Sequence, residues 1–104
     1  MTKATFYFDG NVPYGFLISG HSGFAQEGED IVCASISSAS YMVANTITEI
    51  LKVDADIDVN DAKMKLIVNK EQRHITKDIL LGLKLHLEGL EEQYPEFLKT
   101  LTEV

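Results

Sequence analysis

The chain contains two successive groups of segments, and in each group two short strand-like segments are followed by a long helical segment. Over residues 2–9 apolar and polar residues alternate, which predicts a half-buried strand. A turn signal at residues 9–11 leads into a second predicted strand over residues 13–19. The expected inward faces carry Ala4, Phe6 and Phe8 on the first strand and Tyr14, Phe16 and Ile18 on the second. We therefore expect the two strands to form a hairpin.

The first helical segment is predicted from about Asp30 to about Leu51, after a glycine-rich loop at residues 20–29. Asp30 is typical of an N-cap or of an acid in the first turn. The apolar stripe of this helix follows helical spacing through Val32, Ile36, Ala39, Val43, Ile47 and Ile50. A neighbouring stripe consists of the small or polar residues Cys33, Ser37, Ser40 and Ala44. These residues would allow another stretch of backbone or a partner protein to approach the helix closely.

The second half of the chain predicts another hairpin and another long helix. Alternation over residues 55–59 and a returning strand over residues 64–68 flank a turn at residues 60–61. The helix is expected over residues 71–93, with an apolar side formed by Ile75, Ile79, Leu83, Leu87 and Leu90. Leu80, Leu81 and Leu85 widen this apolar face. The extra width is explained either by a subunit interface or by packing on the chain's own sheet.

The order of the predicted elements is β-β-α-β-β-α. This order indicates an α+β fold with a mostly antiparallel sheet and two helices packed on one face. Tyr94-Pro95 ends the second helix, and residues 96–104 are predicted to form a short strand or a helical turn. With 104 residues, the chain is expected to form one domain over residues 1–104.

Composition argues against several classes of protein. The net charge of −7 argues against direct nucleic-acid binding, and it is compatible with a basic partner or with solubility alone. No apolar run approaches the ~20 residues of a membrane span, and residues 1–5 do not resemble a signal peptide, so we expect no membrane association. Because one cysteine cannot form an internal disulfide, we expect the chain in a reducing cytoplasm.

The only cysteine, Cys33, is expected in the first turn of the first helix. There the positive end of the helix dipole favours the thiolate, which is the nucleophilic form. His21 lies on the turn Gly20-His21-Ser22-Gly23 and, within reach, would deprotonate the thiol or pair with it as imidazolium. Each residue also has an ordinary alternative, since Cys33 can be a small buried hydrophobe and His21 a surface residue or a hairpin anchor. Together they are the candidate nucleophile and base.

Several neighbouring residues are candidates for supporting or substrate-binding roles. Gly20 shapes the turn that carries the histidine, and Asp30 either caps the helix or orients that histidine. Ser37 lies one helical turn after Cys33 and can hydrogen-bond the sulfur or the substrate, or serve as a small packing residue. The backbone N–H groups of Cys33 and Ala34 are expected to form an oxyanion hole. No His, Cys or carboxylate pair shows metal-ligand spacing, so we expect neither a metal nor another cofactor.

The motif residues of this region stand at fixed spacing, namely Gly20-His21-Ser22-Gly23, Gly28, Asp30-Ile31-Val32-Cys33-Ala34 and Ser37. Together they resemble the signature of the ribosomal-processing cysteine proteases, the Prp family, and the order of strands and helices is similar over nearly the whole chain. The resemblance implies that Cys33 and His21 form a catalytic dyad and that Gly20, Asp30 and Ser37 are the remaining motif residues. The residue after the histidine departs mildly, because the family often has alanine where this chain has serine.

The resemblance also implies a small cytoplasmic bacterial hydrolase that forms homodimers. Such a cysteine endopeptidase serves ribosome biogenesis by removing the N-terminal extension of a large-subunit ribosomal protein, so its partner would be that basic precursor. Two alternatives stay open. In a non-catalytic module that docks on a ribosomal protein, Cys33→Ser leaves function intact. In a thiol redox sensor, Cys33 forms a sulfenic acid and His21 is not needed.

Overall fold

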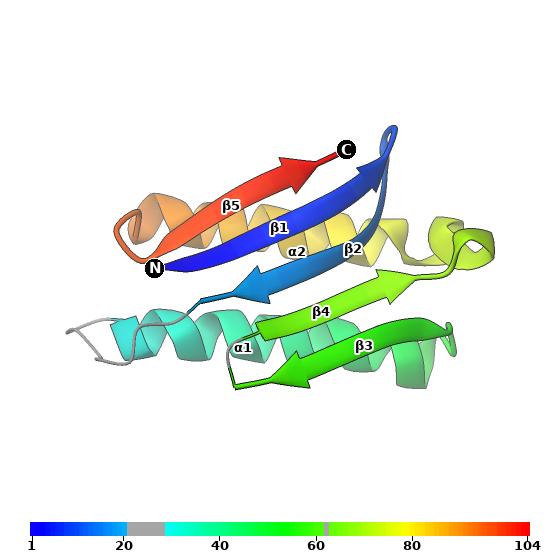
Figure 1. Cartoon of the computed structure of the whole chain (residues 1–104), viewed down its shortest axis with the longest axis horizontal. Coiled ribbons are helices and arrows are strands. Elements are labelled where there is room, and N and C mark those ends of the chain that lie inside the picture. The colour runs from blue at the N-terminus through cyan, green and yellow to red at the C-terminus, as the bar shows by residue number, and fades with distance from the viewer. Residues whose placement is uncertain (21–28, 62) are drawn as a thin grey trace.

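The structure is a computed structural model that describes residues 1–20, 29–61 and 63–104, the side chains of Glu29 and Asp30 excepted. Within these residues five strands form one sheet in the order β3-β4-β2-β1-β5 (Figure 1). The strands are β1 (Thr2–Asp9), β2 (Val12–Ser19), β3 (Ala55–Asn60), β4 (Lys63–Val68) and β5 (Leu98–Glu103). Neighbouring strands are antiparallel except β1 and β5, which run parallel.

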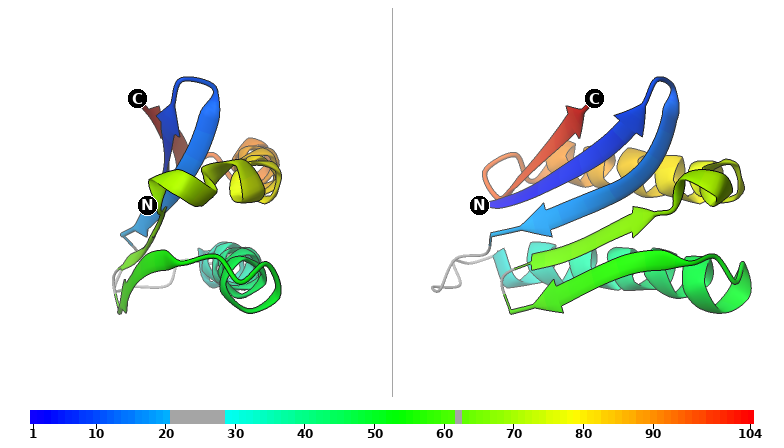
Figure 2. Two further views of the ribbon diagram at one scale, coloured as in Figure 1. Left: turned by 90° about the vertical axis from the view of Figure 1, so that its right-hand side faces the viewer. Right: turned by 45° about the vertical axis from the view of Figure 1, so that its right-hand side comes forward.

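Two helices of the described chain, α1 (Glu29–Asn45) and α2 (Arg73–Gln93), lie next to each other on one face of the sheet (Figure 2). A π-helical turn, η1 (Thr46–Ile50), continues α1, and a 3-10 turn, η2 (Lys70–Gln72), precedes α2. This arrangement confirms the predicted α+β fold, its β-β-α-β-β-α order and the placement of both helices on one face.

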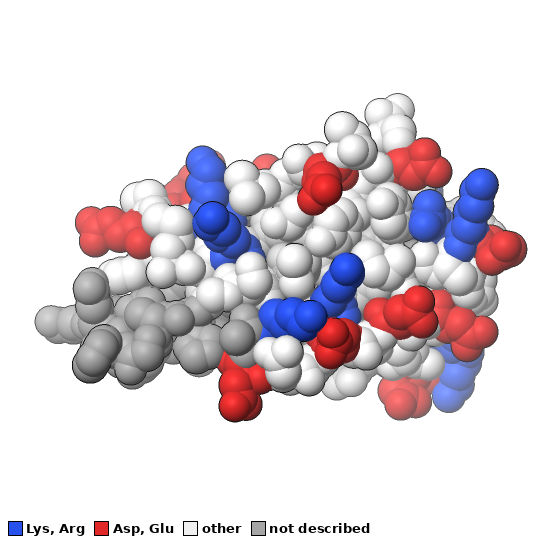
Figure 3. Space-filling view, in the orientation of Figure 1, with Lys and Arg blue, Asp and Glu red and all other residues white. Residues whose placement is uncertain are grey.

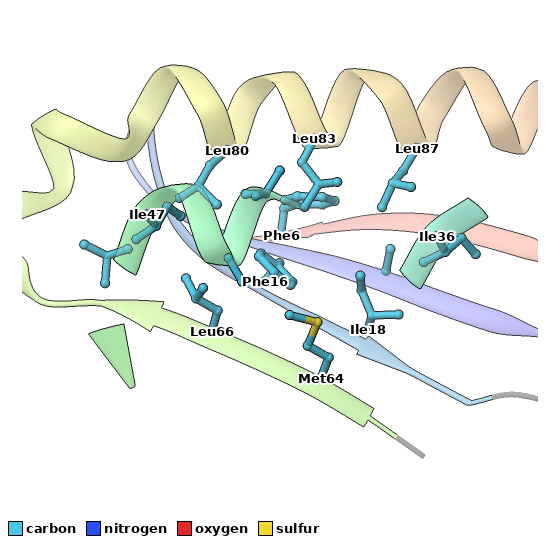
Figure 4. Packing of buried hydrophobic residues seen from close by; sticks show 14 of the residues in the cluster. Phe6, Phe16, Ile18, Ile36, Ile47, Met64, Leu66, Leu80, Leu83 and Leu87 are labelled. Atoms are coloured by element: carbon cyan, nitrogen blue, oxygen red, sulfur yellow. The ribbon is translucent and has the colours of Figure 1, made fainter. Parts of the chain in front are cut away.

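The hydrophobic core fills the space between the sheet and the helices (Figure 4). Phe6 and Phe16 pair across β1 and β2, and their ring centroids lie 6.2 Å apart. Both helices direct most of their predicted apolar stripes into this layer. The buried residues include Val32, Ile36, Val43 and Ile47 from α1 and its π-helical continuation, Leu80, Leu83 and Leu87 from α2, and Met64 and Leu66 from β4.

The buried face of α2 differs in part from the predicted stripe. Leu80, expected to widen that face, is fully buried, whereas Ile75, expected inside, is 42% exposed. Leu81 and Leu85 are 40% and 72% exposed. Packing on the chain's own sheet therefore accounts for Leu80 but leaves Leu81 and Leu85 on the outer surface of the helical layer.

A β-bulge in the first hairpin corrects the prediction for Tyr14. The register shifts by one residue after Tyr7, which pairs with Gly15, and this shift leaves Tyr14 as the extra residue. The ring of Tyr14 stacks on that of Tyr7, which strand alternation places on the sheet face away from the helices. The prediction that Tyr14 shares an inward face with Phe16 and Ile18 is therefore wrong.

The last residues of the chain form a strand, which resolves the two alternatives for residues 96–104. β5 runs parallel to β1, with Thr2 opposite Leu98. The backbone N–H of Thr2 donates a hydrogen bond of 2.9 Å to the carbonyl oxygen of Phe97, and the Leu98 side chain is fully buried. The C-terminal strand thus holds the beginning of β1 in place.

Helix α1 begins at Glu29 and keeps α-helical bonding only to Asn45. The N–H of Leu51 donates to the carbonyl of Thr46 at 2.8 Å, the five-residue spacing of a π-turn. The predicted long helix from about Asp30 to about Leu51 is confirmed in extent, and its last five residues have π-helical rather than α-helical bonding. This change also explains why Ile50, placed on the apolar stripe, is 73% exposed.

The segment Ile31–Ile50 is long and apolar enough to cross a membrane by length and composition alone. This property corrects the expectation that no apolar run approaches that length. In the fold, Val32, Ile36 and Ile47 of this segment are buried against the sheet, as in a helix that contributes to a hydrophobic core.

Candidate active site

The only cysteine of the chain lies on the side of α1 that faces the start of β1. Cys33 is the fifth residue of α1, which begins at Glu29. Its side chain is half-buried, and its Sγ atom lies 3.9 Å from Oγ1 of Thr2, the first residue of β1. The helix therefore holds the thiol against the sheet and leaves part of the side chain accessible to solvent.

Cys33 lines a pocket of about 160 Å³ where α1, the start of β1 and the turn between β3 and β4 meet. Buried side chains of Ile18, Ile36 and Met64 give the pocket an apolar wall. Its other lining residues include Thr2, Gly20, Ser37, Tyr41, Asn60, Asp61 and Lys63. The pocket thus combines a thiol, an apolar surface and a charged rim, which suits a site that receives one side chain of a peptide next to a nucleophile.

Gly20, predicted as a site residue, lines the same pocket as Cys33. It follows the last residue of β2 and has a φ of +79°, a left-handed conformation that favours glycine. A Cβ atom at this position would lie 2.9 Å from the carbonyl oxygen of Met1, which is closer than real contacts allow. Two independent constraints, one of conformation and one of space, therefore require glycine at the edge of the pocket.

Ser37 and Ala34 have different positions relative to the pocket. Ser37 lies one turn after Cys33 on α1, is exposed and lines the pocket, so its hydroxyl is available to a bound ligand. Ala34 is also exposed, but the pocket lining found among the described residues does not include it. The predicted group of Gly20, Cys33 and Ser37 is therefore brought together, and Ala34 points elsewhere.

The helix start contradicts the expected oxyanion hole. Because α1 begins at Glu29, the N–H groups of Cys33 and Ala34 lie beyond the first four N–H groups and donate to carbonyls one turn earlier. They are therefore not free to bind an oxyanion. For the same reason Cys33 lies just past the first turn, whereas Asp30 lies within it as a first-turn acid rather than an N-cap.

The predicted base and its orienting group fall largely outside the described residues. His21 lies in the segment 21–28, which is not among those residues, and of Asp30 only the backbone is described. The two residues that flank that segment are described. Gly20 lines the pocket, and Glu29 begins the helix that carries Cys33.

Sequence reasoning missed Thr2, whose hydroxyl contacts the cysteine sulfur. Its side chain is 4% exposed and shares the inward face of β1 with Ala4 and Phe6. The signal that could have found it is a polar residue at an inward position of a strand that otherwise buries apolar residues. Sequence reasoning also missed the part of the pocket formed by Asp61 and Lys63, because the pattern at residues 60–61 predicts only a turn.

The residues within 1–20, 29–61 and 63–104 offer no evident metal site. Among them, no group of three or more His, Cys, Asp or Glu side chains could hold a metal ion.

Comparisons with known proteins agree along nearly the whole chain. The model of the family described as "Cysteine protease Prp" matches residues 1–99. A curated relative, the ribosomal processing cysteine protease Prp of Bacillus subtilis, is 22% identical over 95 residues, which cover 86% of this chain and 85% of the relative.

Solved structures of similar shape include two of a protein from S. aureus, described as an essential ribosomal processing protease Prp. The complex of that protein with a substrate peptide has a TM-score of 0.89 at 20% identity, and the match covers 99% of this chain and all of the other. Its complex with a covalently linked product peptide has a TM-score of 0.85 at 22% identity, with the same coverage. At these identities the likeness shows that the fold is shared.

Proposed function

The chain belongs to the family of the cysteine protease Prp, and on this premise we propose that it removes the N-terminal extension of a bacterial large-subunit ribosomal protein precursor. Membership makes the enzyme a cysteine protease. The observation that carries the proposal is the position of Cys33, the only thiol in the sequence, in a pocket with an apolar wall. A cysteine protease needs a thiolate nucleophile, and no other residue of this chain can supply one.

His21 is the general base of this proposal. The chain has three histidines. His74 and His86 are exposed on α2, an element that contributes nothing to the described lining of the Cys33 pocket. His21 directly follows Gly20, which lines that pocket, and this adjacency in the sequence supports its choice as the base.

The proposed reaction follows the usual chemistry of a cysteine–histidine pair. The imidazole takes the thiol proton, and the thiolate attacks the scissile carbonyl carbon to form a tetrahedral intermediate. The imidazolium then protonates the leaving amine, the carbon–nitrogen bond breaks, and an acyl thioester remains on Cys33. Water, deprotonated by the same imidazole, hydrolyses the thioester and restores the thiol. The product peptide covalently linked to the S. aureus protein supports a covalent step of this kind.

The pocket next to the thiol supports recognition of an apolar substrate side chain. Ile18, Ile36 and Met64 offer an apolar wall, and the volume of about 160 Å³ suits one large side chain. In this proposal the exposed hydroxyl of Ser37 hydrogen-bonds the peptide. The net charge of −7 favours the approach of a basic ribosomal protein.

The surface supports a protein substrate rather than direct contact with nucleic acid. On the sheet face away from the helices, basic and acidic side chains are interspersed (Figure 3). Nucleic-acid binding requires a continuous basic surface, and the described part of this face does not provide one. We place the enzyme in the cytoplasm, where ribosomal proteins are made and where a single reduced cysteine is stable.

We also propose that the enzyme is a homodimer that associates through its helical layer. On the outer surface of that layer, Met42 of α1 is 58% exposed, and Leu81 and Leu85 of α2 add further apolar area. Exposed apolar surface of this kind is typical of an interface.

Cleavage of a precursor peptide tests the proposed function. The peptide carries the N-terminal extension and the adjoining residues of a large-subunit ribosomal protein, and mass spectrometry locates the cut. We expect one defined cut by the wild type, a loss of about three orders of magnitude or more in Cys33→Ser and His21→Ala, and normal cleavage by His86→Ala.

Two outcomes would overturn the proposal. Binding of the peptide without any cut, unchanged by Cys33→Ser, would identify a docking module. Absence of cleavage together with peroxide oxidation of Cys33 that does not depend on His21 would identify a thiol redox sensor.

A further inference from the structure

Thr2 is a buried polar residue in a position where the fold otherwise places apolar side chains. It is 4% exposed and alternates with Ala4 and Phe6 on the face of β1 that packs under the helices. Both backbone and side chain are fixed, because its N–H donates to the carbonyl of Phe97 at 2.9 Å and its β-branched side chain has few rotamers. The strand therefore presents the Thr2 hydroxyl at one defined point.

At that point the hydroxyl faces the sulfur of Cys33. Oγ1 of Thr2 lies 3.9 Å from Sγ, and either atom can be the donor. Within the described residues, the Thr2 hydroxyl forms its side-chain hydrogen bond with this sulfur. When the sulfur is a thiol, the S–H can donate to the hydroxyl oxygen. When it is a thiolate it can only accept, so the hydroxyl becomes the donor.

We propose that Thr2 is a positioning residue for the reaction of Cys33, and that its hydroxyl donates a hydrogen bond to the thiolate and so orients and stabilises the nucleophile. This inference rests on the proposed function for its catalytic meaning, although the effect on the thiol can be measured without any substrate. Hydrogen bonds to ionised groups are stronger than those to neutral ones, so the contact favours the thiolate over the thiol.

The neighbouring charged groups are common to all variants of Thr2. Among the described residues, the titratable side chains that line the pocket with the thiol are those of Tyr41, Asp61 and Lys63. A substitution that removes only the Thr2 hydroxyl leaves every one of these groups in the protein, so a comparison of variants isolates the hydroxyl.

The first measurement is the rate of alkylation of Cys33 by iodoacetamide as a function of pH, in wild type and in Thr2→Val, which has nearly the same shape. Because only the thiolate reacts, the midpoint of this profile reports thiolate formation. We expect the midpoint of Thr2→Val to rise by about half to one pH unit, a three- to tenfold change in the thiolate equilibrium. Thr2→Ser should restore the wild-type midpoint, because it restores the hydroxyl.

Thr100→Val is the matched control. Thr100 lies on β5 opposite Ala4, and its buried Oγ1 has no hydrogen-bond partner among the described residues. This variant makes the same chemical change on the adjacent strand without touching the sulfur. We expect it to keep the wild-type alkylation profile.

Peptide cleavage then links the hydroxyl to catalysis. For Thr2→Val we expect kcat/KM near neutral pH to fall about three- to tenfold, in step with the thiolate fraction, and to recover as the pH is raised. An unchanged alkylation midpoint in Thr2→Val would overturn the inference, even if the wild type cleaves the peptide. A shifted midpoint in a protein that cleaves nothing would uphold the Thr2–Cys33 contact and overturn the proposed function instead.

Discussion

Glycine at position 20 links the end of β2 to the pocket that Cys33 lines. Its φ of +79° and the nearby carbonyl of Met1 leave no room for a side chain, so the direction in which the chain leaves β2 depends on this residue. His21, the proposed base, follows directly. A change at position 20 therefore affects both stability and the position of the histidine.

Gly20→Ala should destabilise the protein by about 1–2 kcal/mol, because a Cβ is disfavoured at positive φ and here also collides with Met1. It should also reduce peptide cleavage. Gly10→Ala is the matched control, since Gly10 has a similar φ of +63° but no described atom lies within 4 Å of the place its Cβ would take. Urea denaturation and the cleavage assay measure both. Equal stability losses together with full activity of both variants would contradict the argument.

Tyr7 makes the free energy of unfolding of the protein depend on pH in the alkaline range. Burial raises the pKa of Tyr7 above its ordinary value of 10.0, and the charges of Glu103 and Tyr14 raise it further. The folded state therefore holds the phenol proton more tightly than the unfolded state. The resulting stability is fully present below pH 10 and is lost as the pH rises through the raised pKa.

Tyr7→Phe should consequently weaken the decline in stability above pH 10, because it removes the titrating group. Glu103→Gln should weaken it to a smaller extent, because it removes only one cause of the shift. Urea midpoints across this pH range provide the measurement. A decline as steep in Tyr7→Phe as in the wild type would assign it to other groups.

The helices and hairpins were predictable because each has a local signature. The stripe through Val32, Ile36 and Val43 has helical spacing, and β1 alternates strictly, so neither requires knowledge of its neighbours. β5 was not predictable, because its partner β1 lies at the other end of the chain and its short sequence suits a strand or a turn equally well. The prediction that Tyr14 points inward was wrong because a single bulge reverses the alternation of the strand.

The candidate site was predictable to the extent that it lies on one continuous segment. Cys33 and Ser37 share a helix face at a spacing that the sequence displays, and Gly20 precedes the histidine directly. Thr2 and Asp61 reach the site only through strand pairing and the β3–β4 turn, which no local pattern reveals. The oxyanion prediction failed because it depended on the helix start to within one residue, the least certain feature of a helical pattern.

β5 should contribute a large part of the stability through one side chain. Leu98 is fully buried under α2, so Leu98→Ala should cost about 2–4 kcal/mol through lost burial and the cavity left behind. Leu101→Ala on the same strand is the control. Leu101 is 38% exposed on the open face, and its loss should cost less than about 1 kcal/mol. Chemical denaturation of both variants tests this difference, and equal costs would show that β5 is only loosely attached.

The molecule as a whole has two broad surfaces, the outer surface of the helices and the open face of the sheet (Figure 2). If the proposed dimer forms through the helices, Leu85→Glu should convert it to a monomer, because a charge would be buried in an apolar interface. Leu101→Glu places the same charge on the open sheet face and should leave the dimer intact. Sedimentation equilibrium distinguishes the two variants. If Leu101→Glu dissociates the dimer and Leu85→Glu does not, the interface lies on the open face of the sheet.

The parallel pairing of β1 with β5 has a consequence for protein synthesis. β1 is synthesised before β5, and the two strands meet at Thr2 and Leu98. Until residues 98–103 have been released, one edge of β1 has no partner and the N–H of Thr2 lacks its acceptor at Phe97. The position of Thr2 beside Cys33 therefore depends on a strand that is made more than sixty residues after the cysteine itself, so the surroundings of the thiol form only once both segments have met.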